Sequence, residues 1–350
     1  MTKIIADDFL LTNDYAAELY HEYAKELPII DFHNHLSPIE IADNTPYETI
    51  TDIWLGGDHY KWRLMRANGI HEYYVSGEAS PWEKFEAWAE TVPNTLGNPL
   101  FHWTQMELKR YFGIDEVLSN KNAKEIWDIT NRELQKEHMH PRQLLVHDKV
   151  EFVGTTDDPT DPLDHHKRLL DEKLSVQVAP SFRPDKGLDI ESSQFDRWLK
   201  KLERAAGKEV NGYLSFLQAL SDRVDYFDQH GCRASDHGIS EMYYEEASEK
   251  QVSDVFQKRL RGEGITKIEA DQFRTYTLQF LAERYFEKDW AMQFHLGALR
   301  NNNTKMFQQI GRDSGYDSPG DSLLAKPLSR FLDSVNSTGK LPKTVLYCLN

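Results

Sequence analysis

Two histidines separated by a single residue, His33 and His35, are the side chains of this sequence best suited to chemistry. They follow residues 27–30, an apolar and β-prone segment typical of a buried parallel strand. Residues i and i+2 of a strand point to the same face, so we expect the two imidazoles to lie side by side. Such a pair suits a divalent cation such as Zn²⁺, which needs further ligands from elsewhere in the fold. The alternative is a hydrogen-bonded histidine pair without a ligand role.

Polar residues also follow the other strands that the sequence predicts, at residues 150–156, 175–180, 232–237 and 291–298. Because the carboxyl ends of parallel strands meet at one end of a barrel, these side chains are expected to lie close together. The candidates are Thr155, Thr156, Asp157 and Asp158 after the second strand, Arg183 after the third, Asp236 and His237 at the fourth, and His295 at the fifth, shortly before Arg300 and residues 301–303.

Each candidate also has a purely structural explanation. Asp157 and Asp158 could cap a helix or form a turn. Arg183 could form a surface ion pair, and His295 could be a core histidine bonded to a backbone carbonyl. Residues 301–303, three asparagines, could be a solvated loop. Their shared position at one predicted end of the strands favours a joint functional role.

Strands that alternate with helices predict an α/β fold with a parallel sheet and right-handed crossovers. With a last strand at 343–348 the count reaches six, whereas a closed barrel needs eight. We therefore expect a (β/α)8 TIM-like barrel that lacks its last two strands, with residues 1–350 forming a single, incomplete barrel domain. Residues 38–145 contain no convincing central strand and predict a helical insertion after the first strand, which caps the active-site end.

Composition excludes several classes of protein. The net charge of −16 among 350 residues argues against nucleic acid as a partner, because phosphate binding needs a basic surface. Two cysteines allow no disulfide framework and no thiolate zinc site. No apolar run approaches the ~18 residues of a membrane span, and the first residues lack the apolar core of a signal peptide. A cytoplasmic protein without membrane association is expected.

Eight blocks of the sequence carry a family resemblance. They are residues 31–36 (DFHNHL), 57–66 (GDHYKWRLMR), 102–103 (HW), 110–113 (RYFG), 155–159 (TTDDP), 182–184 (FRP), 234–238 (ASDHG) and 295–303 (HLGALRNNN). In these blocks, and in their order across nearly the whole chain, the sequence resembles the uronate isomerases, a divergent branch of the amidohydrolase superfamily.

That resemblance implies an aldose–ketose isomerase that interconverts D-glucuronate with D-fructuronate and D-galacturonate with D-tagaturonate. It further implies one divalent metal, usually zinc, held by His33 and His35 together with an aspartate from a Thr-Asp-Ser-Arg type motif. This sequence contains no such motif. By the same resemblance His59 and Tyr60, on the insertion, contact the small anionic sugar-acid substrate, although packing at the rim is the alternative for Tyr60.

Moving a carbonyl from C1 to C2 requires a group that removes the C2 proton and a source of a proton for C1. The enediolate formed between these steps carries negative charge, which a cation or strong donors must stabilise. Asp236 and His295 are our candidates for the acid/base or orienting pair. Arg183 is the candidate clamp for the substrate carboxylate, because a guanidinium can bind it with two hydrogen bonds. Arg300 is a second candidate for the same task.

Two other functions remain open at this point. A metal-dependent hydrolase of the same superfamily would use a metal-bound hydroxide, with a carboxylated lysine or two further histidines as ligands. The second alternative is an inactive truncated fragment or a module that only binds sugar acids. An incomplete barrel would also leave open sheet edges that can pair with another chain, so we expect a homo-oligomer.

Overall fold

The computed structural model describes residues 4–348 of the chain. Its internal contacts divide the chain into two compact units. The first contains the residues up to Ile29 with Asp43–Lys149 and Arg300–Asp317, and the second contains Ile30–Ala42, Val150–Leu299 and the residues from Ser318 onward. Whether residues 1–350 act as one barrel domain with 38–145 as its insertion stays a prediction.

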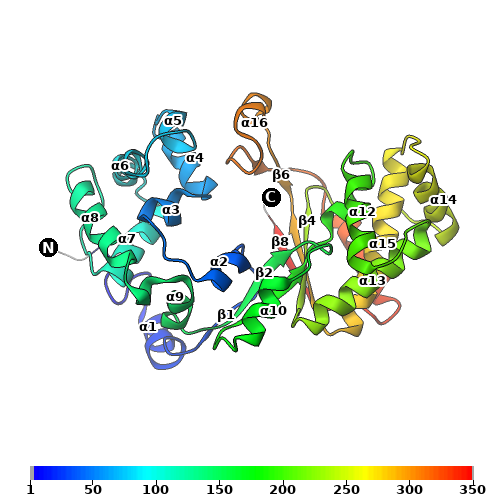
Figure 1. Cartoon of the computed structure of the whole chain (residues 1–350), viewed down its shortest axis with the longest axis horizontal. Coiled ribbons are helices and arrows are strands. Elements are labelled where there is room, and N and C mark those ends of the chain that lie inside the picture. Colours follow the sequence, from blue (N-terminus) through cyan, green and yellow to red (C-terminus); the bar gives the residue numbers. More distant parts are fainter. Residues whose placement is uncertain (1–3, 349–350) are drawn as a thin grey trace. The chain divides into compact units, whose positions relative to one another are not determined.

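The second unit is built on a six-stranded sheet whose strands follow one another in chain order (Figure 1). Its last four neighbouring pairs all run parallel. Such a consecutive parallel order is the pattern of a (β/α)8 barrel, which confirms the predicted fold class with two strands fewer than a closed barrel. The strands are β1 (Ile29–Asp31), β2 (Val150–Asp157), β3 (Gln177–Phe182), β4 (Ala234–Ile239), β5 (Ala291–Leu296) and β8 (Thr344–Cys348).

Helices cover the outer face of this sheet, as strands that are buried on both faces require. Five of the six residues of β3 are buried, and helices α10, α13 and α15 pack against β3 and β5. Aromatic side chains of α13 and α15, such as Phe216 and Phe273, fill the core between the helices. The helices are α2 (Pro38–Asp43), α10 (Asp164–Asp171), α11 (Asp185–Leu188), α12 (Phe195–Ala206), α13 (Tyr213–Gln229), α14 (Glu249–Leu260), α15 (Lys267–Glu287) and α17 (Ala325–Asn336).

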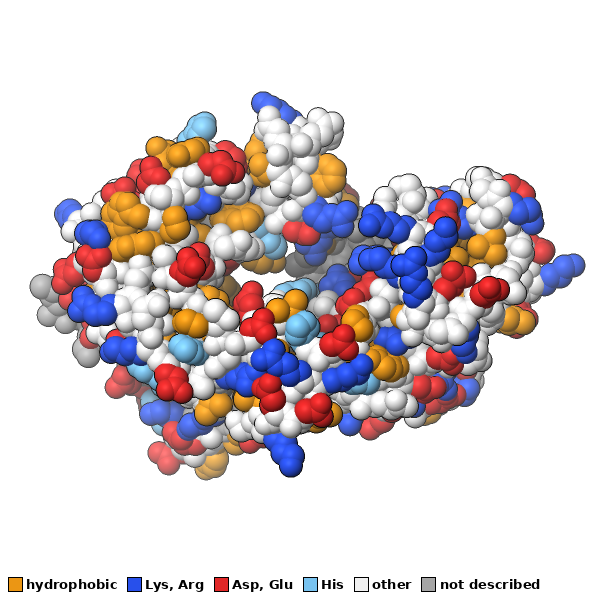
Figure 2. All heavy atoms as spheres, viewed as in Figure 1, with side chains coloured by type: hydrophobic (Ala, Val, Ile, Leu, Met, Phe, Trp, Pro, Cys, Tyr) orange, Lys and Arg blue, Asp and Glu red, His pale blue; other side chains and the backbone are white. Residues whose placement is uncertain are grey.

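Helix α12 shows how the charge of this acidic chain is distributed. Its apolar residues, including Trp198 and Leu202, are buried against the core. The opposite face exposes four basic residues, and Figure 2 shows lysine and arginine side chains gathered over this helix. A net negative charge therefore coexists with local basic surface, which is compatible with an anionic ligand. The four basic residues are Arg197, Lys200, Lys201 and Arg204.

The first unit is helical, as predicted for the residues between the first two strands. Trp54, Phe85 and Trp88 lie at the centre of its core. Capping boxes at Thr49 and Ser80 begin two of its helices. Its elements are α1 (Asp14–Glu18), a π-helix (Leu19–Ala24), α3 (Ile50–Leu55), α4 (His59–Ala67), α5 (Glu72–Val75), α6 (Pro81–Thr91), α7 (Pro99–Phe112), α8 (Ala123–Leu134), α9 (Pro141–His147), α16 (Thr304–Ile310) and short 3₁₀ turns at Val92–Asn94 and Glu137–Met139.

A segment far along the chain, Arg300–Asp317, also belongs to this first unit. Arg63 of α4 donates from Nε to the carbonyl of Gly315 and from Nη2 to the carbonyl of Asp317, at 3.1 and 2.9 Å. Gly315 has a φ of +92°, and a Cβ there would lie 2.8 Å from the carbonyl oxygen of His59. The close approach of this segment to α4 therefore depends on a glycine. The segment is preceded by β6 (Ala298–Leu299) and followed by β7 (Ser318–Pro319), which pair antiparallel.

No helix among the described residues is long and apolar enough to cross a membrane.

A buried polar group in β2 makes the stability of the fold depend on pH. Burial raises the pKa of Asp157 to about 7, even though Thr155 donates a hydrogen bond to its carboxylate at 2.6 Å. A raised folded-state pKa means that the folded chain holds the proton more tightly, so this contribution to stability is present at low pH and is lost as the pH rises to about 7. The asparagine in Asp157→Asn cannot ionise, so this variant does not lose that part of its free energy of unfolding as the pH rises.

We expect the free energy of unfolding of Asp157→Asn, relative to the unsubstituted protein, to rise by about 2–3 kcal/mol between pH 5 and pH 7.5. Denaturant titrations across that range measure the difference. His166, whose pKa burial lowers to about 4, opposes this trend and lies 3.7 Å from Asp157 Oδ2, so the comparison is repeated in a His166→Asn background that removes its contribution. Asp164→Asn, an exposed carboxylate on α10, is the control and should show no such trend. A pH-independent difference would contradict this account of Asp157.

Candidate active site

Three side chains from three strands meet at one point of the second unit. His33 follows β1, Asp236 lies in β4 and His295 lies in β5. One ligand atom of each, an imidazole nitrogen or a carboxylate oxygen, lies within 4.8 Å of the other two. The predicted convergence of polar residues from separate strands is therefore present for these three residues.

The nitrogen and oxygen atoms through which this group could bind a metal are buried and lack ordinary hydrogen-bond partners among the described residues. His295 Nε2 lies 2.9 Å from Asp236 Oδ1, at ion-pair distance, and neither atom makes a well-aligned hydrogen bond among the described residues. His33 Nδ1 is also buried, with no hydrogen-bond partner in the part of the chain that the structure describes. Buried polar atoms are nearly always hydrogen-bonded, so three such atoms without a well-aligned partner, one on each residue of this group, require an explanation. A divalent cation supplies one, because imidazole nitrogen and carboxylate oxygen are typical ligands of zinc.

The charge states of these residues fit that role. Burial alone would raise the pKa of Asp236, but the neighbouring His295 ring and the Arg183 guanidinium hold it below its ordinary value. Burial lowers the pKa of His33. At neutral pH the carboxylate is therefore ionised and the His33 imidazole is neutral, as metal coordination requires.

His35 lies beside this group rather than in it. Its ring contacts that of His33 edge to face, with centroids 5.3 Å apart. The two histidines are neighbours as the sequence predicted, but both lie beyond the last residue of β1, Asp31. On the other side, the ring of Tyr347 in β8 stacks on His295 with centroids 4.4 Å apart and an interplanar angle of 9°. Sequence reasoning identified the β8 strand but not this tyrosine.

Arg183 connects Asp236 to a second carboxylate. Its Nη1 donates to Asp236 Oδ2 and its Nε donates to Asp185 Oδ2, both at 2.9 Å. Its backbone nitrogen donates to the carbonyl of Asp157, which holds it at the end of β3. The arginine does form an ion pair, but with a completely buried carboxylate of the candidate site rather than on the surface. Nη2 has no hydrogen-bond partner among the described residues, and the side chain is 27% exposed.

The remaining predicted site residues lie together in the first unit. His59 and Tyr60 begin α4, with ring centroids 4.4 Å apart. Arg300 donates to Asp317 Oδ2 at 2.7 Å, and the backbone nitrogen of Asn301 donates to Oδ1 of the same residue. His59 also contributes to the electrostatic environment of Asp317. The predicted residues thus form two groups, one in each unit.

Several other polar residues are structural. Asp158 accepts from the backbone nitrogen of Thr160 and from the indole of Trp198, as the turn interpretation required. His237 packs on Tyr285 and Phe294, and neither of its buried ring nitrogens has a hydrogen-bond partner among the described residues. Asn303 caps α16 by accepting from the backbone nitrogen of Met306.

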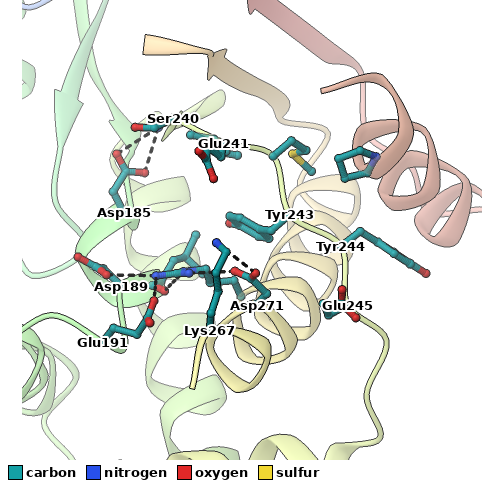
Figure 3. A pocket seen from close by; sticks show the side chains of 16 residues that line it. Asp185, Asp189, Glu191, Ser240, Glu241, Tyr243, Tyr244, Glu245, Lys267 and Asp271 are labelled. Carbon is teal, nitrogen blue, oxygen red and sulfur yellow. Dashed lines mark hydrogen bonds and ion pairs between the residues drawn. The ribbon is translucent and has the colours of Figure 1, made fainter. Parts of the chain in front are cut away.

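A cavity of 690 Å³ lies in the second unit, between the segments that follow β3 and β4 (Figure 3). Asp185 and Gly238 form part of its wall. Arg274, which also lines the cavity, pairs with Asp271 and Glu191 at 3.0 and 2.8 Å, so its charge is already neutralised. Acidic side chains prevail around the cavity, which argues against it as a site for an anion.

Comparisons with known proteins give one consistent result. A family model described as glucuronate isomerase matches residues 1–350. A uronate isomerase of Caldanaerobacter subterraneus is 51% identical over 351 aligned residues, which cover 100% of this chain and 75% of that protein. A uronate isomerase of Bacillus subtilis is 50% identical, with 100% and 74% covered. The crystal structure of a uronate isomerase from Thermotoga maritima gives a TM-score of 0.94 at 35% identity, with 100% of this chain and 76% of that chain covered. A glucuronate isomerase from Caulobacter crescentus gives 0.91 at 27%, with 99% and 74% covered.

Proposed function

Because the chain belongs to the uronate isomerase family, we propose that it interconverts D-glucuronate with D-fructuronate and D-galacturonate with D-tagaturonate. Two observations carry this proposal. His33, Asp236 and His295 form a group that could bind a metal, called the donor group below, and it lies beside Arg183. The family model matches the chain over residues 1–350. We further propose that the reaction takes place in the cytoplasm and that the protein is a homo-oligomer.

His33, Asp236 and His295 are the residues that would hold a divalent metal, and we propose Zn²⁺ because imidazole and carboxylate ligands suit it. When bound, the cation would stabilise the negative charge of the enediolate. His35 contacts His33 and is assigned here to the same metal site, as a further ligand or as support for the His33 ring.

The resting charge states determine which way protons can move. An ionised Asp236 can accept a proton but has none to give. A group that takes the proton from C2 and returns it to C1 meets the demand of an aldose–ketose isomerisation. We assign the proton transfer to Asp236 Oδ2, because Oδ1 and His295 Nε2 belong to the metal-binding group, and we assign His295 to orienting Asp236.

The substrate carries a carboxylate at the end of the sugar that does not react, and two arginines are available to bind it. Arg183 offers Nη2 because its other donor groups are committed to Asp185 and Asp236. Arg300 is held by Asp317 and is about half exposed. His59 and Tyr60, in the same unit as Arg300, are assigned to the hydroxyl groups of the sugar.

For Arg300→Lys we expect a 10- to 100-fold higher KM for D-glucuronate with little change in kcat, because lysine keeps the charge but loses the planar set of donors. Steady-state kinetics measure this split. Lys305→Arg, on the neighbouring helix α16, is the matched control and should leave both constants unchanged. A fall in kcat at constant KM would instead place Arg300 at the reacting carbons.

A coupled assay tests the proposed activity directly. The metal-loaded protein is mixed with D-glucuronate or D-galacturonate, and the ketose is followed with an NADH-dependent reductase. We expect turnover of at least one hexuronate and none of lactones or amides. Hydrolysis of a lactone or amide without isomerisation would favour the metal-dependent hydrolase. Binding of glucuronate by calorimetry without turnover would favour a binding module.

A further inference from the structure

We propose that Asp185 and Gly238 position the Arg183 guanidinium, so that Asp236 keeps one carboxylate oxygen for the metal and Arg183 keeps one nitrogen for the substrate. Neither Asp185 nor Gly238 touches the donor group of His33, Asp236 and His295 in the contacts described above. Both act through Arg183. This inference rests on the proposed function and deepens it by adding two positioning residues to the same site.

Asp185 is fixed from two directions. Its Oδ2 accepts from Arg183 Nε at 2.9 Å. The backbone nitrogen of Gly238 donates to both of its carboxylate oxygens, at 3.2 Å to Oδ1 and 3.1 Å to Oδ2. A side chain that follows β3 is thereby tied to the backbone of β4. Because Arg183 Nε is hydrogen-bonded to Asp185, the guanidinium plane cannot rotate freely about the side-chain bonds that carry it.

Gly238 provides the space that the guanidinium occupies. A Cβ at this position would lie 2.6 Å from Arg183 Nη2 and 3.0 Å from Asp185 Oδ2. The backbone of Gly238 does not have a positive φ, so alanine could adopt its conformation. The glycine is therefore needed for close approach and not for its backbone angles. Any side chain here would displace Nη2, the one nitrogen of this guanidinium without a hydrogen-bond partner among residues 4–348.

The arrangement divides the oxygens of Asp236 between two tasks. Nη1 of Arg183 takes Oδ2, whereas Oδ1 faces His295 Nε2 and lies in the donor group. A guanidinium that is free to rotate can bind both oxygens of a carboxylate in parallel, which is its preferred geometry. Without Asp185, Arg183 could therefore take both oxygens of Asp236 and compete with the metal for Oδ1. Asp185 prevents this because its hydrogen bond with Arg183 Nε fixes the orientation of the guanidinium relative to Asp236.

Substitutions at Asp185 and at Gly238 are expected to affect different properties, namely Zn²⁺ affinity and the KM for D-glucuronate. Asp185→Asn removes the charge that holds Nε, and we expect Zn²⁺ affinity to fall 10- to 100-fold, as is typical when a partner behind a metal ligand is lost. Competition with a chromophoric chelator measures that affinity without reference to activity. Gly238→Ala should raise KM for D-glucuronate at least 10-fold while Zn²⁺ affinity changes less than threefold, because the clash is at Nη2. Asp185→Glu should recover part of the affinity.

Asp189→Asn is the matched control, since Asp189 lies four residues further along, pairs with Arg274 and does not contact Arg183. It should match the unsubstituted protein in Zn²⁺ affinity and kinetics. Thermal unfolding of each variant separates these effects from a loss of folding, and the Asp185→Glu variant keeps the test informative if Asp185→Asn does not fold. Unchanged Zn²⁺ affinity in folded Asp185→Asn, with an unchanged KM in Gly238→Ala, would overturn the inference. If the unsubstituted protein binds Zn²⁺ but turns over no uronate, the proposed function fails while the Asp185→Asn result still decides the positioning role.

Discussion

Asp236→Asn is expected to lower kcat for D-glucuronate by about 10³-fold, within the range found when a group that handles the reacting proton is removed. The substitution preserves shape but removes the charge at the centre of the site. Asp236 is fully buried, accepts from Arg183 and lies 2.9 Å from His295. An amide in its place cannot accept the C2 proton and is a poorer metal ligand. Initial rates at saturating metal and substrate measure the effect.

A buried carboxylate of comparable surroundings controls for the general cost of this change. Asp271 on α15 is almost as buried and pairs with Arg274 and Lys267 in the same unit. Asp271→Asn should reduce stability but leave kcat within about threefold of the unsubstituted value. If Asp236→Asn retains more than a tenth of the activity at full metal loading, Asp236 does not take part in proton transfer.

His33→Asn is expected to abolish stoichiometric Zn²⁺ binding and, with it, isomerase activity. His33 Nδ1 is buried without a hydrogen-bond partner, and the ring centroid lies 4.5 Å from that of His295. Loss of one of three protein donors removes a large part of the affinity, because the remaining two cannot fill the coordination shell of zinc. Metal analysis after dialysis, together with activity after readdition of Zn²⁺, tests both statements.

His138→Asn serves as the control for this experiment, because His138 is exposed and pairs with Glu133 on the surface of the first unit. It should bind Zn²⁺ and turn over substrate normally. His35→Asn is informative in the same series. A loss as severe as that of His33→Asn would make His35 a ligand, whereas a milder loss would make it a support for the His33 ring. Full Zn²⁺ occupancy in His33→Asn would remove this histidine from the metal site.

Much of the fold and part of the site followed from local sequence patterns. Apolar runs bounded by turns predicted six strands, and their alternation with helices predicted a parallel sheet. Position at a strand end brought His295 into the candidate site, because parallel strands place their carboxyl ends together, whereas Asp236, predicted at the end of its strand, is the third of the six residues of β4. The structure supports that step, since both residues lie beside His33.

What the sequence did not predict depends on contacts between distant segments. The Arg300–Asp317 segment joins the unit of α4 through hydrogen bonds from Arg63. The periodicity of apolar residues in the sequence does not predict such a contact. The tie between Asp185 and Gly238 crosses from the end of β3 to β4. Tyr347 reaches His295 because it is its register partner in the neighbouring strand, a relation that only the strand pairing reveals. Supporting residues of this kind are fixed by tertiary structure rather than by motif.

The most direct test combines metal and function in one titration. Metal-free protein receives increasing Zn²⁺, and the ketose formed from D-glucuronate is measured at each step. A single site built on His33, Asp236 and His295 predicts that the rate rises in proportion to Zn²⁺ up to one equivalent per chain and then stays constant. A rate that does not depend on Zn²⁺, or no ketose at any loading, would contradict a uronate isomerase whose chemistry is organised by that site.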